Sequence, residues 1–346
     1  MIDLARKGPP GLSERFRARP PRSMFFFLFP TLGDAVVMTG PLGWFRRRYP
    51  EARIVVATSA LARPILEACP FVDEVWLRPR SRIAAMLGFV ARLRRERFDL
   101  GINTYGQNNG LLMMGLGRMG AIVGMKTSKY ARFYDAWDES NPDENLVVEG
   151  MARIARMVDV EPGDWRPAFT IPPEMAQGAR EWLVAEGLGP GEPYVAIQVG
   201  ASNPNKAWPL ARFLEIAARV EAAGVRCVYV GGPAEASALA AVGKGRGLNL
   251  AGKLEVLETA EVLRGARLLV TNDSGPMHLA GGVGTRCVAI YGPTRPINHP
   301  PYGEGHVLIP GACACARKDQ DSCLGTCIAA VGVGEVWQGI EHALNT

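Results

Sequence analysis

The chain has 346 residues, of which 48% are hydrophobic and 21% charged, with 40 glycines and 26 prolines. This length exceeds the usual size of one hydrophobic core and predicts two domains of about 150 residues, and the composition excludes a wholly disordered chain. The formal net charge of +5 is too small to indicate nucleic-acid binding, and no stripe of basic and aromatic residues supports that function. No apolar run reaches the roughly 18 residues of a membrane-spanning helix, so we expect a soluble protein.

Residues 1–23 are rich in arginine, lysine and proline and lack the apolar stretch of a secretory signal. We predict a disordered basic tail, which is either simply solvated or attracted to an anionic membrane face. The expected location is therefore the cytoplasm, with a peripheral contact to the inner membrane face as the further option.

Strand-like and helix-like patterns alternate through the first half of the chain. Strands are predicted at 24–29, 53–58, 72–77 and 98–103, and helices at 35–49, 61–69 and 83–97. This alternation predicts a parallel sheet with helices on both faces.

Six prolines between residues 161 and 193 mark the predicted domain junction. The alternation then restarts, with strands predicted at 194–199, 226–230, 268–271 and 287–291, and helices at 210–223, 235–242, 257–265 and 277–282. We therefore expect two Rossmann-like βαβ domains facing across a cleft, one at 24–170 and one at 171–332. The second includes a cysteine-rich loop at 311–328, and a closing helix at 333–346 is predicted to reach back to the first domain.

Ligands of open α/β sheets bind beyond the carboxyl ends of the strands, so the loops that follow strands are the candidate sites. In the first such loop, Gly33 permits a ligand to approach the backbone closely, and Asp34 stands at the start of a helix. Asp34 is either an N-terminal helix cap or the general base that removes a proton from an acceptor hydroxyl.

The second candidate loop runs from Gly200 to Trp208 and contains Ser202 and Lys206. Small residues let backbone N–H groups approach a phosphate, to which Lys206 would add a positive charge. A lysine in a polar loop is also often merely solvated, and that alternative stays open.

The third loop passes from a strand into a helix whose first turn contains Pro276. Free N–H groups at this positive helix end are suited to a diphosphate. Asp273 would repel a diphosphate, so we expect it to accept hydrogen bonds from sugar hydroxyls. His278 would either donate to phosphate or pack inside the domain.

These loops resemble, in order and spacing, glycosyltransferase family 9, whose best-known members are the ADP-heptose:lipopolysaccharide heptosyltransferases. The resemblance extends from Met24 to Leu344 and is carried by Gly33-Asp34, Tyr49-Pro50, Phe98-Asp99-Leu100, Gln107, Lys206-Ala207-Trp208, the segment 273–280 and the segment 291–294. It implies the GT-B architecture, with an acceptor-binding domain at 24–170 and a donor-binding domain at 171–332. It also implies Asp34 as catalytic base, Lys206 on the donor diphosphate and the segment 273–278 holding the donor.

The resemblance further implies an inverting transfer that requires no metal or other cofactor. The most specific expectation is transfer of heptose from ADP-heptose, the nucleotide-diphosphate sugar donor, to a lipopolysaccharide core acceptor. The alternatives are another nucleotide sugar, or an acceptor that is another glycan or a protein. The predicted donor-binding residues are Gly33, Gly200, Ser202, Lys206, Gly231, Asp273, Ser274, Gly275, Met277 and His278.

The sequence contains two further patterns. The run from Gly115 to Gly120 matches the G-x-G-x-x-G pattern of dinucleotide sites, but a helix-like run precedes it and a strand-like run follows, which is the wrong order. Four cysteines at 313, 315, 323 and 327 are enough to surround a structural zinc or iron ion, or they are free thiols. The remaining alternative is therefore a non-catalytic, metal-binding assembly protein that keeps the fold. The predicted metal ligands are Cys313, Cys315, Cys323 and Cys327.

Overall fold

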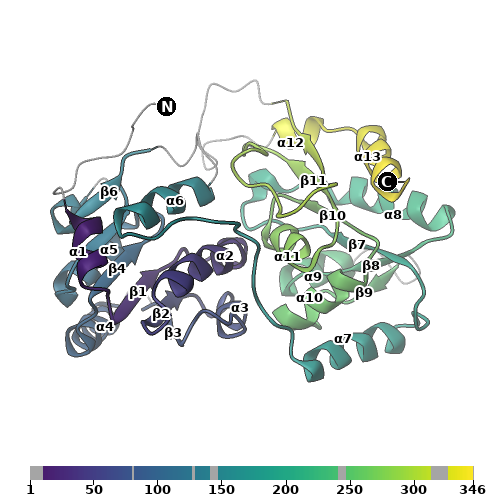
Figure 1. Ribbon diagram of the computed structural model, residues 1–346. Helices are drawn as coiled ribbons and strands as arrows, with labels where there is room; N and C mark the ends of the chain where they lie inside the picture. Colours follow the sequence, from purple (N-terminus) through teal and green to yellow (C-terminus); the bar gives the residue numbers. More distant parts are fainter. Residues whose placement is uncertain are drawn as a thin grey trace. The chain divides into compact units, whose positions relative to one another are not determined.

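The computed structural model describes residues 11–79, 82–126, 129–140, 147–240, 247–312 and 326–345. The chain divides into two units, Met1–Thr170 and Ile171–Thr346. Each unit contains a six-stranded parallel sheet between two layers of helices (Figure 1). Both units are therefore of the Rossmann type.

The sheet of unit 1 has the strand order β3-β2-β1-β4-β5-β6. Its strands are β1 (Ser23–Phe27), β2 (Arg53–Thr58), β3 (Glu74–Leu77), β4 (Leu100–Asn103), β5 (Ile122–Met125) and β6 (Ala136–Asp138). From β1, the strands continue through β2 to β3 on one side, and from β4 through β5 to β6 on the other. The strand order reverses between β1 and β4, and such a reversal defines a switch point.

Helices cover both faces of this sheet because its central strand is apolar on both faces. Met24 and Phe26 pack with α1 (Leu12–Ala18), α2 (Leu32–Arg48), α3 (Arg63–Glu67) and α6 (Val147–Met157). Phe25 and Phe27 pack with α4 (Ile83–Glu96) and α5 (Asn108–Gly117). A short 3₁₀ turn, η1 (Ala131–Phe133), follows β5. A strand buried on both sides reads as a continuous apolar run, which is the pattern seen in the sequence.

The prediction that residues 1–23 form a disordered tail is wrong for the part that the structure describes. Leu12 and Phe16 lie one helical turn apart in α1, and both are buried against the core of unit 1. The Arg17 guanidinium also contacts the Asp159 carboxylate at 2.7 Å. Only two apolar residues anchor this helix, so its signal was hidden among the charges.

The sheet of unit 2 repeats the same topology, with the order β12-β11-β10-β7-β8-β9. Its strands are β7 (Tyr194–Gln198), β8 (Arg226–Tyr229), β9 (Leu248–Asn249), β10 (Leu268–Asn272), β11 (Cys287–Tyr291) and β12 (Val307–Pro310). The switch point of this unit lies between β7 and β10.

The helices of unit 2 also form two layers. One face is covered by α8 (Leu210–Ala222), α9 (Pro233–Ala240), α12 (Thr326–Ala330) and α13 (Val333–Asn345). Contacts to β7, β10 and β11 place α10 (Val256–Gly265) and α11 (Gly275–Val283) on the sheet, and α7 (Pro173–Ala185) packs against α10. A 3₁₀ turn, η2 (Pro204–Lys206), lies in the loop after β7.

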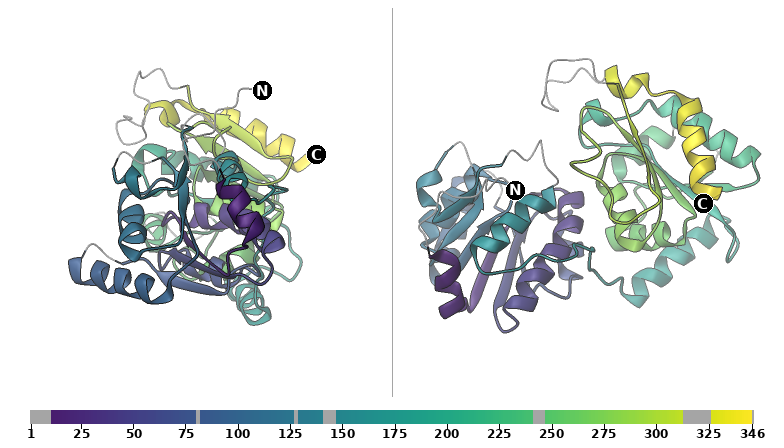
Figure 2. Two further views of the ribbon diagram at one scale, coloured as in Figure 1. Left: turned by 60° about the vertical axis from the view of Figure 1, so that its left-hand side comes forward. Right: turned by 45° about the horizontal axis from the view of Figure 1, so that its top comes forward.

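The closing helix, α13, packs on the sheet of unit 2. Val336 and Ile340 of α13 are fully buried in the core of unit 2, where the helix packs against β11, β12 and α8. In the right panel of Figure 2, α13 lies along unit 2 in yellow. The amphipathic pattern predicted the helix correctly, but it carried no information about which sheet the apolar face would cover.

Among the described residues, every helix is too short or too polar to cross a bilayer.

Candidate active site

Each sheet places two loops side by side at its switch point. In unit 1 these loops follow β1 and β4, and in unit 2 they follow β7 and β10. Open α/β sheets bind ligands at this position, where the loops diverge and leave a crevice at the carboxyl edge. All three loops selected from the sequence are among these four.

Asp34 lies in the first turn of α2 and is half-buried. The N-cap of this helix is Thr31, whose hydroxyl accepts a hydrogen bond from the Asp34 backbone N–H at 3.4 Å. The same hydroxyl donates to the Asp34 carboxylate. Because Thr31 caps the helix, the capping alternative for Asp34 is wrong, and its carboxylate is held at the carboxyl edge of the sheet.

Tyr105 approaches the same carboxylate from the loop after β4. Its hydroxyl hydrogen-bonds to Asp34, and its ring contacts that of Phe29, with 5.4 Å between the centroids. Burial, together with the negative charge and hydrogen bond of Asp34, raises the pKa of Tyr105 well above its ordinary value. Tyr105 therefore stays protonated and can only donate to Asp34. Motif matching missed this residue, and the signal that could have found it is its position directly after β4, at the switch point.

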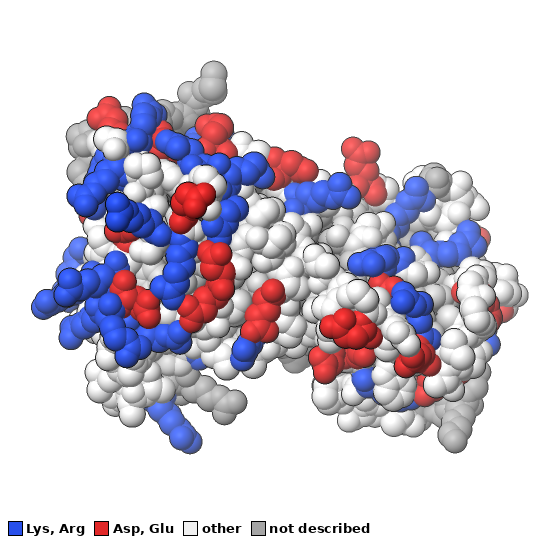
Figure 3. Space-filling view, turned by 60° about the horizontal axis from the view of Figure 1, so that its bottom comes forward, with Lys and Arg blue, Asp and Glu red and all other residues white. Residues whose placement is uncertain are grey.

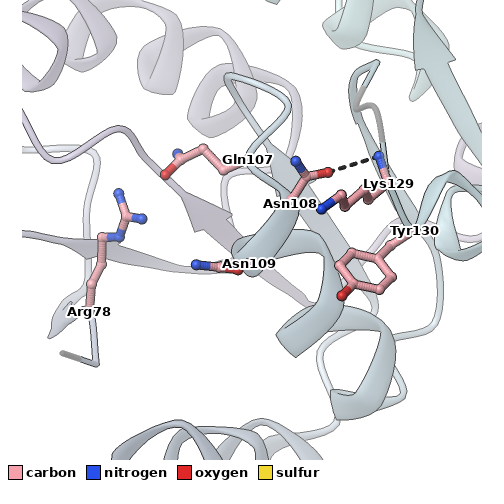
Figure 4. Close-up of a pocket in the computed structure, with 6 residues that line it drawn as sticks. All are labelled: Arg78, Gln107, Asn108, Asn109, Lys129 and Tyr130. Atoms are coloured by element: carbon pink, nitrogen blue, oxygen red, sulfur yellow. Dashed lines mark hydrogen bonds between the residues drawn. The ribbon is translucent and has the colours of Figure 1, made fainter. Parts of the chain in front are cut away.

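A hollow of about 410 Å³ lies at this edge and is lined by Arg78, Gln107, Asn108, Asn109, Lys129 and Tyr130 (Figure 4). Arg78 donates to the Leu28 carbonyl at 3.0 Å, and burial lowers its pKa to about 10, so it stays charged at neutral pH. Asn108 accepts a hydrogen bond from the Lys129 backbone at 2.9 Å. Amides and cations of this kind suit a ligand rich in hydroxyl groups and negative charge.

In unit 2, Lys206 and Asp273 meet across the switch point. The Lys206 ammonium lies 2.6 Å from an oxygen of Asp273, and only 14% and 4% of the two side chains are exposed. Thr294 donates a hydrogen bond to the same oxygen at 2.5 Å. Burial alone would raise the pKa of Asp273, but the charge of Lys206 and the two hydrogen bonds lower it below its ordinary value. Lys206 is therefore held in place by a buried counter-ion and is not a solvated surface lysine.

Buried amide side chains fix the two loops of unit 2 to each other. Asn272 donates to the Gly200 carbonyl at 2.9 Å and accepts from the Trp208 backbone at 2.9 Å. Gln198 accepts hydrogen bonds from Thr271 at 2.9 Å and Ser274 at 3.0 Å. Because these partners are buried and satisfied, the loops around Lys206 are rigid before any ligand arrives.

The third loop enters α11 at Gly275, with Ser274 as N-cap. The Ser274 side chain makes no capping hydrogen bond. Pro276 has no N–H and the Met277 N–H donates to the Ser274 carbonyl at 3.1 Å, so it is the Gly275 N–H that this helix start offers to a ligand. His278 is buried in the second turn, and Met277 is fully buried with its sulfur 3.2 Å from the Tyr291 hydroxyl. The Met277 side chain therefore belongs to the core beneath the loop.

The remaining predicted residues of unit 2 surround a glutamate that sequence reasoning missed. A Cβ atom at Gly200 would lie 1.7 Å from Oε1 of Glu235, and Gly231, with φ of +149°, also lies against that side chain. Glu235 Oε2 accepts a hydrogen bond from the Gly232 backbone at 2.8 Å. Ser202 is exposed on the loop. An acidic residue after the second strand is where Rossmann domains hold a ribose hydroxyl, and this position was the available signal.

The predicted metal cluster is only partly visible. Cys313, Cys315 and Cys323 lie outside the described residues, and Cys327 is buried in α12. Within the described ranges, no three His, Cys, Asp or Glu side chains are grouped as metal ligands. The three other described cysteines, Cys69, Cys227 and Cys287, are buried as small apolar residues.

Comparison with known proteins gives a match to the family model described as glycosyltransferase family 9 (heptosyltransferase), over residues 86–328. The chain belongs to glycosyltransferase family 9. It is thus a glycosyltransferase, and its two Rossmann-type units are those of the GT-B architecture.

Among proteins similar to this family 9 chain is lipopolysaccharide heptosyltransferase 2 of Salmonella typhimurium, 26% identical over 291 residues, 78% of this chain and 82% of that protein. The family 9 glycosyltransferase structure from Veillonella parvula superposes with a TM-score of 0.83 at 20% identity, covering 94% of this chain and 97% of that one. The ADP-heptose lipopolysaccharide heptosyltransferase II structure from E. coli gives a TM-score of 0.77 at 21% identity, covering 93% and 98%. The structural likenesses show the fold of this family 9 member.

Proposed function

We propose that this family 9 glycosyltransferase transfers heptose from ADP-heptose to the core of a lipopolysaccharide acceptor, with inversion at the anomeric carbon. The donor and acceptor follow from its similarity to lipopolysaccharide heptosyltransferases over most of the chain. The observation that carries the proposal is that each unit places one chemically suited group at its switch point. Unit 1 places the carboxylate of Asp34 there, and unit 2 the cation of Lys206.

Asp34 acts as the general base. Its carboxylate takes the proton of the acceptor hydroxyl while that oxygen attacks the anomeric carbon from the face opposite the diphosphate. The new C–O bond forms as the old bond to phosphate breaks, and ADP leaves with the bonding electrons. Hydrogen bonds from Thr31 and Tyr105 aim the carboxylate.

Lys206 and the start of α11 stabilise the leaving diphosphate. The ammonium has three donors, and Asp273 uses one of them, so two remain for phosphate oxygens. The backbone N–H of Gly275 adds a donor at the positive end of a helix. Asp273 therefore serves mainly to hold Lys206, and the sugar-binding role expected for it passes to other groups. Glu235 is proposed to bind the ribose. These groups need no metal ion to neutralise the developing charge.

The hollow lined by Arg78 and Gln107 is proposed to bind the acceptor. Its cations and amides match a glycan that carries carboxylate or phosphate groups. Such an acceptor is anchored in lipid, so the enzyme would act in the cytoplasm and touch the inner membrane face.

A transfer assay with purified protein tests this function. A panel of nucleotide sugars is first compared by thermal shift, because a tight donor raises the unfolding temperature by mass action. ADP-heptose is expected to give the largest shift and to support transfer to a lipopolysaccharide core acceptor. Asp34→Asn should lower kcat by about 10²–10⁴-fold, the range of general-base catalysis, and keep the donor-induced shift. Arg78→Gln should raise KM for the acceptor alone.

Two results would count against the proposal. A shift with another nucleotide sugar and none with ADP-heptose would exclude heptose as the sugar. Undiminished turnover in Asp34→Asn would remove Asp34 from the mechanism.

A structural metal ion remains a separate proposal for Cys313, Cys315, Cys323 and Cys327. Four thiolates in one short segment can complete a tetrahedral zinc or iron site. Elemental analysis of the purified protein tests this proposal, and a protein without stoichiometric metal would refute it. Transfer activity is expected to survive loss of the metal, because no step of the mechanism uses it.

A further inference from the structure

Unit 1 exposes apolar side chains at the edge of its sheet where the strands end. Phe29 follows β1, Leu61 follows β2, Leu77 ends β3, and Ile83 begins the next helix, with Leu87 one turn further on. Their exposed fractions are 38%, 57%, 47%, 76% and 62%. Among described residues, the one other large apolar side chain that unit 1 exposes is Leu116, at the far end of α5. Exposed apolar residues are common singly, but five on one edge indicate a contact surface.

The start of α4 contributes most to this surface. Its buried residues begin only at Phe89, so the preceding turns, including Ile83 and Leu87, extend beyond the core. In the left panel of Figure 2, α4 projects in blue from the rest of unit 1. The two side chains are four residues apart and therefore share one face of the helix. Met86 of this helix end packs against the core, whereas Ile83 and Leu87 face solvent.

The net charge of unit 1 indicates what kind of partner would bind this apolar edge. This unit has 25 Lys and Arg against 18 Asp and Glu, a net +7, whereas unit 2 has 14 against 16, a net −2. Figure 3 shows Lys and Arg side chains spread over unit 1. Arg78 and Arg82 flank the apolar residues, and neither forms an ion pair with any described residue. The first turn of α4 contains no acidic residue.

We propose that this edge, formed by Phe29, Leu61, Leu77, Ile83 and Leu87, docks on an anionic phospholipid bilayer. The apolar side chains enter the boundary between headgroups and acyl chains, and Arg82 remains among the lipid phosphates. A second copy of the chain fits less well, because its own unit 1 would bring a further +7 to the contact. The charge asymmetry therefore favours lipid over self-association.

Docking at this edge is consistent with the proposed acceptor site. The hollow lined by Arg78 and Gln107 opens at the same carboxyl edge, since these residues follow β3 and β4. A glycolipid headgroup emerging from the bilayer would reach the hollow without leaving the membrane. This step rests on the proposed function, but the docking itself does not.

Vesicle binding by the full chain tests the surface. Sedimentation is measured with vesicles of equal parts phosphatidylglycerol and phosphatidylcholine, and with phosphatidylcholine alone, at low and high salt. The wild type is expected to bind the anionic vesicles and to be released by salt. Ile83→Gln combined with Leu87→Gln should weaken vesicle binding at least about tenfold, because two apolar side chains that would enter the bilayer are lost. Leu116→Gln, the matched control at the other end of the unit, should bind as the wild type does.

Equal vesicle binding by the double variant and the wild type would overturn the proposal. The proposal would also be overturned if the double variant bound vesicles as the wild type does but eluted from a size-exclusion column at a different volume. That result would indicate that the surface binds a protein. Neither readout uses a sugar donor, so failure of the docking surface is distinct from failure of the proposed transfer. On a water-soluble acceptor, the double variant should keep wild-type turnover, and a loss there would assign these residues to the reaction instead.

Discussion

The Lys206 ammonium and an oxygen of the Asp273 carboxylate lie 2.6 Å apart, in a setting where 4% of the aspartate is exposed. The two residues are 67 positions apart in the sequence and meet because β7 and β10 are neighbours in the sheet. The cation proposed to receive the diphosphate is therefore already positioned. Loss of either residue would leave the charge of the other buried and unpaired. Two predictions concern this pair.

Lys206→Met should reduce both donor binding and stability. The substitution leaves the Asp273 carboxylate buried without its cation, which costs about 3–5 kcal/mol in other proteins. Chemical denaturation measures the loss. Adding Asp273→Asn should recover most of the stability but none of the activity, and a double variant as unstable as Lys206→Met would show that the charge pair is not the cause.

Asp273→Asn should change how stability depends on pH. The pKa of Asp273 is lowered in the folded protein, so the pair stabilises the fold above the ordinary carboxyl pKa. This contribution is lost as the pH falls below about 4, toward the lowered value. Between pH 7 and pH 3, the unfolding temperature should therefore fall more steeply in the wild type than in Asp273→Asn. Parallel curves would contradict the assignment.

Tyr105→Phe should lower kcat and leave KM for the donor nearly unchanged. The substitution removes the hydrogen bond to Asp34 and keeps the ring contact with Phe29. A hydrogen bond to a charged group contributes about 1.5–3 kcal/mol, which corresponds to a loss of roughly 10–100-fold. Steady-state kinetics give the measurement. A raised KM with unchanged kcat would contradict the assignment.

Gly200→Ala should raise KM for the donor with little change in stability. The new methyl group would occupy the position of the Glu235 carboxylate, 1.7 Å away, and that flexible side chain would have to turn aside. Gly334→Ala is the matched control, since a Cβ there meets no atom within 4 Å and the residue lies in a helix. Titration of ADP followed by thermal shift compares the two. Equal ADP affinity in both variants would remove Glu235 from the donor site.

The apolar patterns in the sequence predicted the central strands because those strands are buried on both faces. Each of β1, β2, β7, β10 and β11 contains a run of at least three buried apolar residues. The strands missed were β6, β9 and β12, which lie at sheet edges and have two to four residues. Short edge strands bury too little apolar surface to leave a pattern, so their pairing is decided by the rest of the sheet.

The family, the two Rossmann units and the loops carrying Asp34, Lys206 and Asp273 could be predicted because each leaves a local run of residues with its own signal. The neighbours of these three residues could not be predicted in this way. Tyr105 reaches Asp34 because β4 pairs with β1, and Lys206 is held by Asp273 because β10 pairs with β7. Strand pairing is non-local, so no window of sequence records it.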